Sequence, residues 1–157
     1  MAAEGPEGAA CEVWFYHLER TGLDQALPEL LEKTLQRGWK AIVRSSMAER
    51  IEHLDAWLWS YRDESFLPHA PAEDPGAARQ PILLTTGSEN PNHADALFLV
   101  DGAEPGDLAG YRRCVILFNG ADDDQLRNAR SQWSAVKARG CPVSYWKQQA
   151  RGWEKQA

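Results

Sequence analysis

No apolar run in this 157-residue sequence is long enough to cross a membrane. A spanning helix needs about 18 to 20 consecutive apolar residues, and polar or charged residues interrupt every run well before that length. The opening residues, MAAEGPEGAACE, also lack the basic leader and apolar stretch of a secretory signal. We therefore expect a cytoplasmic protein with no membrane contact.

Cysteine is scarce, since the chain has only Cys11, Cys114 and Cys141. An odd number, with two of the three in or beside apolar runs, does not suit a disulfide framework. No CxxC or HxxxH spacing occurs, so the usual zinc-ligand patterns are absent as well. We expect reduced cysteines in the core and no metal site.

The motifs of nucleotide and acyl chemistry are also missing. There is no GxxxxGK[ST] phosphate loop, no GxGxxG fingerprint and no GxSxG elbow. The acidic groups Glu49 with Glu52 and Asp122 to Asp124 stand at predicted helix starts, where carboxylates cap helices and offset the dipole. The histidines have no metal-ligand spacing: His17, His53, His69 and His93. We expect no catalytic residues and no cofactor.

Charge is unevenly distributed. The net charge of −6 argues against general coating of nucleic acid, which needs clustered Lys and Arg. From residue 127 to residue 157, however, seven basic side chains face Glu154 alone, which leaves +6 there and −12 on the remainder. This asymmetry is the strongest clue in the composition.

The size and composition suit one soluble domain. The chain is 43% hydrophobic and 25% charged, which indicates neither global disorder nor a membrane protein. We predict a disordered lead-in over residues 1–11 and a single α/β domain over 12–157. Seven tryptophans raise the odds of a binding surface, because this residue is enriched at interface anchors as well as in cores.

The periodicity of apolar residues predicts six strands and three helices. The strands are Val13–Leu18, Ala41–Val43, Ile82–Thr86, Ala96–Val100, Cys114–Phe118 and Pro142–Trp146. One helix carries Leu23 to Leu35 and ends at Gly38, one carries Ile51 to Leu58, and one runs from the Asp122 group to about Arg139. This order favours three layers, with helices on both faces of a mostly parallel sheet.

Some local features can be predicted as well. Pro28 fits best in the first turn of its helix, where its missing N–H costs nothing. Ser46 with Glu49 is typical of a capping box. The segment from residue 63 to residue 81 is dense in turn formers and is expected to be a long surface loop.

The last predicted helix combines an apolar stripe with a basic flank. The stripe is Leu126, Ala129, Trp133 and Val136, and the flank is Arg127, Arg130 and Lys137 with Ser134 between them. Such a pattern also fits a core face with a solvated flank. The +6 excess favours the alternative, a surface for a ligand that is both acidic and hydrophobic.

A second aromatic group follows from LDAWLWSYRDESFLPH, residues 54–69. Core burial explains Trp57 or Trp59, but hardly both together with Tyr61 and Phe66. We predict an exposed aromatic patch here.

Together these segments resemble a known family. The motifs LDAWLW, SFLPH, PILLTTG, FLVDG and ARSQWSAVKARGCPVSYWKQQARGWEKQA are similar, in order, to those of the chi subunit of the bacterial DNA polymerase III holoenzyme, over nearly the whole chain after residue 12. The resemblance implies a Rossmann-like α/β fold. It also implies a non-catalytic accessory protein of the clamp loader, within a DNA-directed DNA polymerase (nucleotidyltransferase) holoenzyme that functions in DNA replication.

The resemblance implies two protein partners. One is the acidic C-terminal tail of the single-stranded-DNA-binding protein, which ends in Pro-Phe. The family's tail-binding arginine and aromatic correspond to Arg130 and Trp133, with Arg127 and Lys137 as neighbours. A lysine common after the aromatic is Ser134 here, and Lys147 could supply that charge instead.

The second implied partner is psi, a small clamp-loader subunit. Its binding residues correspond to Trp59 and Phe66, with Pro68 and His69 beside them. Another clamp-loader subunit or a repair helicase could take the same place. Two further functions stay open: a small nucleotide-binding or hydrolytic enzyme on the same scaffold, and direct binding of single-stranded nucleic acid by the basic aromatic tail.

Overall fold

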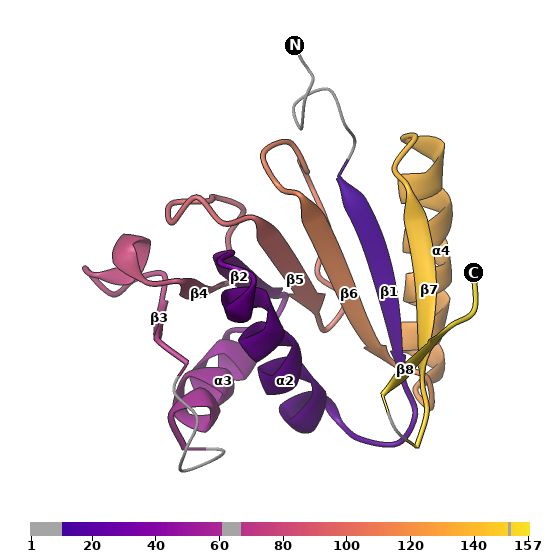
Figure 1. Cartoon of the computed structure of the whole chain (residues 1–157), viewed down its shortest axis with the longest axis horizontal. Coiled ribbons are helices and arrows are strands. Elements are labelled where there is room, and N and C mark those ends of the chain that lie inside the picture. The colour runs from indigo at the N-terminus through magenta and orange to yellow at the C-terminus, as the bar shows by residue number, and fades with distance from the viewer. Residues whose placement is uncertain (1–10, 61–66, 151) are drawn as a thin grey trace.

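A computed structural model describes residues 11–60, 67–150 and 152–157 (Figure 1). The elements are, in order, β1 (Glu12–Leu18), α2 (Leu23–Gln36), β2 (Ala41–Ser45), α3 (Ala48–Ser60), β3 (His69–Pro71), a 3-10 turn η1 (Ala77–Arg79), β4 (Ile82–Thr85), β5 (Ala96–Val100), β6 (Arg113–Asn119), α4 (Asp123–Ala138), β7 (Val143–Gln148) and β8 (Trp153–Lys155). All six predicted strands and all three predicted helices occur.

The strands form one sheet in the order β3-β4-β2-β5-β6-β1-β7-β8. Every neighbouring pair is parallel except β7 with β8. The predicted mostly parallel α/β sheet is confirmed.

Helices cover both faces of the sheet, with α2 and α3 on one face and α4 on the other (Figure 1). Alternation along β1 divides its side chains between the two cores. Tyr16 and Leu18 pack in the core under α2 and α3, whereas Val13 and Phe15 pack in the core under α4. The predicted three-layer arrangement is confirmed.

The prediction for Pro28 is wrong, because α2 begins at Leu23 and places Pro28 in its second turn. A proline there cannot donate to the carbonyl four residues earlier, that of Asp24. The indole nitrogen of Trp57, on α3, donates to this carbonyl at 2.6 Å. A tertiary hydrogen bond thus replaces the helical one, which no local pattern could reveal.

The predicted capping box does not form. The hydroxyl of Ser46 donates to the backbone carbonyl of Asp101 at 2.7 Å, and the first helical residue is Ala48. Instead, Ser45 Oγ accepts the N–H of Met47 at 3.0 Å. The loop after β5 competes for the serine that the sequence pattern assigns to the helix.

Two short strands were not predicted. β3 lies inside the segment expected to be a long loop, and β8 lies in the C-terminal tail. Pro71 is compatible with β3 because this strand is at the edge of the sheet. Strands of three residues carry too little alternation to be recognised, since their pairing with a neighbour is what defines them.

All three cysteines are free, with Cys11 and Cys114 buried and Cys141 partly buried. Burial raises the pKa of the Cys11 thiol to about 12 and that of Cys114 well above its ordinary value. Over the described ranges, no helix has the length and apolarity needed to cross a bilayer.

Candidate partner-binding site

Helix α4 begins and ends at the expected signals. The carboxylate of Asp122 accepts the N–H groups of Asp124 and Gln125 at 3.0 and 3.2 Å, which is an N-cap. Gly140 follows the helix with φ of +86°, a conformation that favours glycine. The helix is therefore fixed at both ends by its own sequence.

The apolar stripe of α4 faces the sheet, as its spacing predicts. Ala129 and Val136 are buried, whereas Leu126 and Trp133 are partly buried. Gln132 is buried as well, and its side-chain nitrogen donates to the carbonyl of Ala103 at 3.0 Å. This polar anchor was not predicted, because its acceptor lies on a distant loop.

A cavity of about 350 Å³ opens between α4 and strands β1, β6 and β7. Its lining residues are Phe15, Phe118, Leu126, Ala129, Arg130, Trp133, Ser134 and Tyr145. We call it the α4 pocket. The ring of Trp133 lies 5.3 Å from that of Phe15 and 6.0 Å from that of Tyr145, centroid to centroid. Aromatic walls and one exposed cation, Arg130, thus share a single cavity.

The structure brings together only part of the predicted basic group. Arg130 and Trp133, three residues apart on α4, both line the α4 pocket. Arg127 and Lys137 are exposed on the same helix outside the lining, and Arg127 pairs with Asp124 at 3.1 Å. Lys147 lies on β7, where its ammonium is 3.0 Å from Glu19 Oε1.

Tyr145 and His17 belong to the same surroundings and were not predicted. The phenol oxygen of Tyr145 lies 2.5 Å from Nδ1 of His17, across 128 residues of sequence. Burial raises the pKa of Tyr145 and lowers that of His17. A side chain at Gly120 would put its Cβ 1.8 Å from His17 Nε2, so the imidazole ring would have to move to accept any residue other than glycine there. His17 on β1 and Tyr145 on β7 become neighbours only because these two strands pair in the sheet.

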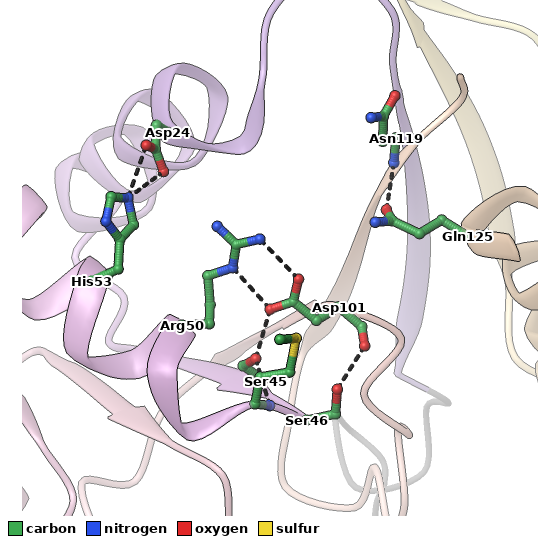
Figure 2. Close-up of polar contacts among 9 residues, drawn as sticks. Asp24, Ser45, Ser46, Arg50, His53, Asp101, Asn119 and Gln125 are labelled. Atoms are coloured by element: carbon green, nitrogen blue, oxygen red, sulfur yellow. Dashed lines mark hydrogen bonds and ion pairs between the residues drawn. The ribbon is translucent and has the colours of Figure 1, made fainter. Parts of the chain in front are cut away.

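A second crevice lies at the carboxyl edge of the sheet, where α/β folds usually bind their ligands. It opens beside β1 and β6, whose following helices go to opposite faces (Figure 1). Figure 2 shows its centre: Asp101 accepts two hydrogen bonds from Arg50, at 2.9 and 3.1 Å, and one from Ser45, at 2.7 Å. Of the two arginines that line this crevice, Arg50 is thus held by the chain itself, whereas Arg20 is exposed.

The backbone amides of the loop after β1 are likewise bound by a side chain of the same protein. The backbone N–H groups of Glu19, Arg20 and Thr21 all donate to Oε1 of Gln148, at 3.1, 2.7 and 2.9 Å. Consecutive amides of this kind form an anion-binding nest in phosphate-binding proteins. Here the side chain of Gln148, from the end of β7, occupies that place. This arrangement weighs against the nucleotide-binding alternative.

The second predicted site is described only in part, since Phe66 lies outside the described residues. Trp59 is 52% exposed, and its ring lies 4.3 Å from that of His69. His69 is buried, with Nδ1 2.6 Å from the carbonyl of Leu67. The buried ring of His69 therefore packs against the exposed ring of Trp59. Pro68, which precedes His69, is half-buried.

A search of the described ranges for groups of three or more His, Cys, Asp or Glu side chains that could hold a metal ion finds none.

Comparison with known families identifies the family of this chain. The model of the family described as DNA polymerase III chi subunit, HolC, matches residues 11–144, well over half of the 157-residue chain. The chain belongs to the DNA polymerase III chi subunit family. This confirms the resemblance drawn from the motifs, and the match includes Arg130 and Trp133 but ends before Tyr145.

Two curated relatives agree. The probable DNA polymerase III subunit chi of Rickettsia prowazekii is 32% identical over 94 residues, 60% of this chain and 55% of that protein. The DNA polymerase III subunit chi of Pseudomonas aeruginosa is 28% identical over 120 residues, 76% of this chain and 82% of that protein. The chain therefore matches little more than half the length of the first of these relatives.

Proposed function

We propose that this chain is a non-catalytic accessory subunit of a DNA polymerase III holoenzyme, and that it links the clamp loader to single-stranded-DNA-binding protein. The observation that carries this proposal is the α4 pocket. Arg130 and Trp133 share it, and none of its described lining residues is acidic. A ligand with an aromatic end and a carboxylate would fill the apolar walls and meet the cation at the rim.

The acidic tail of single-stranded-DNA-binding protein, which ends in Pro-Phe, has this chemistry. The basic side chains beyond the first turn of α4 would steer the tail, so that binding weakens as salt rises. Arg127 and Lys137 lie outside the pocket lining and would act as steering charges. Lys137 would contribute most to this steering, because Asp124 offsets the charge of Arg127. Glu19 likewise offsets the charge of Lys147.

Titration of the full chain with a peptide of the partner's last ten residues tests this function. We expect saturable binding at low salt, lost when the terminal Phe is removed. No measurable binding at low salt, or equal binding of the shortened peptide, would overturn the proposal. Trp59→Ala serves as a control that leaves tail binding unchanged, since Trp59 lies on α3, away from the pocket lining.

We further propose that the patch around Trp59 binds a clamp-loader subunit of the psi type. A tryptophan with half its surface exposed, supported by a buried histidine ring, is the kind of rigid aromatic anchor that interfaces use. Co-purification of the full chain with clamp-loader subunits, for wild type and Trp59→Ala, tests this. Equal recovery of both chains would contradict it, and recovery of a helicase instead would redirect it. A cytoplasmic location follows from this function and stays a prediction.

A further inference from the structure

A groove of about 360 Å³ lies on the face of the sheet opposite α4. On this face α2 and α3 cover the strands toward β3, and no described helix lies over β1 and β7 (Figure 1). One wall of the groove is α2, with Lys33, and its C-cap residue Arg37. The other wall consists of rings from β1, β7 and β8: Trp14, Tyr16, Trp146 and Trp153.

Rings and guanidinium groups pack against one another in this groove. Trp146 stacks on Trp14 with centroids 5.2 Å apart. The guanidinium carbon of Arg113 lies 3.8 Å from the Trp14 ring and 5.2 Å from the Trp39 ring. Arg37 lies 4.4 Å above the same Trp39 ring. The cations are therefore held in place by cation–π contacts before any ligand binds.

The positive charge of the groove is poorly compensated. Lys33, Arg37 and Arg113 line it, and none of its described lining residues is a carboxylate, although the chain has a net charge of −6. The nearest acidic partner of Arg113 is Glu12, at 3.8 Å.

Arg113 itself lacks a full set of partners. Its side chain is 15% exposed, and its buried Nε has no hydrogen-bond partner. Burial accordingly lowers its pKa. An anion in the groove would stabilise the charged form of this guanidinium through the electrostatic field, without contacting the buried Nε.

We propose that this groove binds single-stranded nucleic acid, with phosphate oxygens at Lys33, Arg37 and Arg113 and bases against the partly exposed rings of Trp146 and Trp153. Proteins that bind such strands combine a cationic groove with aromatic side chains on which bases stack. Four of the lining residues are partly exposed tryptophans, which favours flat bases over the mixed side chains of a peptide. The site lies on the opposite face from the α4 pocket, so it does not depend on tail binding.

Fluorescence anisotropy with a labelled oligo-dT strand tests the groove in the full chain. Three phosphate contacts predict a slope of log affinity against log salt of about −2. Arg37→Glu should weaken binding about tenfold or more, and Lys33→Glu with Arg37→Glu should abolish it. Arg79→Glu is the matched control, because Arg79 is exposed on η1 and outside the groove lining.

Trp153→Ala should also weaken binding about tenfold, since each stacked base contributes substantially. Melting curves of each variant establish that it is folded. Equal affinities for wild type, Arg37→Glu and Arg79→Glu, or no binding to wild type at low salt, would overturn the proposal. So would an acidic peptide that displaces the strand at equal concentration, because the groove would then be a peptide site. Arg130→Ala should bind the strand normally, which separates this result from failure of the tail-binding function.

Discussion

The carboxyl-edge crevice and the α4 pocket differ in whether a lining arginine has a carboxylate partner. In the crevice, Arg50 makes two hydrogen bonds to Asp101, and the amides of the loop after β1 are taken by Gln148. In the α4 pocket, Arg130 has no carboxylate within ion-pair distance among the described residues. At the position that this fold normally offers to a nucleotide, the chain's own side chains thus pair with Arg50 and with the loop amides, whereas Arg130 at the α4 pocket keeps a charge that no described carboxylate pairs.

The largest effect should come from Arg130→Ala, which removes the cation of the α4 pocket. A charged hydrogen bond to a ligand contributes about 1.5 to 3 kcal/mol, so tail-peptide binding should weaken about 10- to 100-fold. Isothermal titration at low salt measures it. Arg127→Ala is the matched control and should cost less than about threefold, because Arg127 is 74% exposed and paired with Asp124. If both variants lost tail-peptide affinity to a similar extent, Arg130 would have no special role, and general electrostatic attraction would explain the binding.

Gly120→Ala should be the most destabilising change near the pocket. The added Cβ would overlap the ring of His17, and overpacking of this kind costs about 1 to 3 kcal/mol. Because His17 contacts Tyr145, tail binding should weaken as well. Urea denaturation measures the free energy of unfolding. Gly76→Ala, where the nearest atom is 3.7 Å from the added Cβ, should change it by less than about 0.5 kcal/mol.

Gln148→Ala tests the role of the side chain that binds the loop amides beside the carboxyl-edge crevice. It leaves the three amides of the loop after β1 without their acceptor, so we expect a loss of about 1 to 2 kcal/mol of stability. Gln149→Ala removes only a 3.4 Å contact to Glu154 and should have little effect. Thermal melting with and without ATP completes the test. A rise in the wild-type melting temperature with ATP would revive the nucleotide-binding alternative.

The smallest effect concerns pH. Burial lowers the pKa of His17 in the folded chain below its ordinary value of 6.5, so the unfolded chain binds a proton more readily. The stability that neutral His17 contributes is therefore present above pH 6.5 and is lost as pH falls through the folded pKa. Denaturation at pH 7.5, 6.5 and 5.5 measures this loss. His17→Gln should show a shallower decline than wild type, and identical slopes would contradict the assignment.

The sequence was a good guide wherever a feature depends on neighbours along the chain. Apolar periodicity located the strands and helices, and Asp122 and Gly140 marked the ends of α4. The spacing of three between Arg130 and Trp133 placed them on one helical face, and the structure puts both in one pocket. Whether that pocket binds the tail stays a prediction, as does the role of Trp59.

Errors arose where a distant segment decided the outcome. Pro28 is compatible with the second turn of α2 only because Trp57 satisfies the carbonyl of Asp24. Ser46 bonds the loop after β5 instead of capping α3. A local pattern assigns each polar group its nearest partner, and a better partner in the folded chain overrides it.

By itself, the sequence determined the layered α/β architecture and the helix that carries Arg130 and Trp133, because hydrophobic period and capping residues act within a few turns. Only the tertiary structure decided that Tyr145 and His17 meet behind the α4 pocket, that Gln148 fills the loop after β1, and that Arg113 lies between Trp14 and Trp39. These contacts depend on strand order, and residues from distant strands become neighbours only when the sheet has assembled.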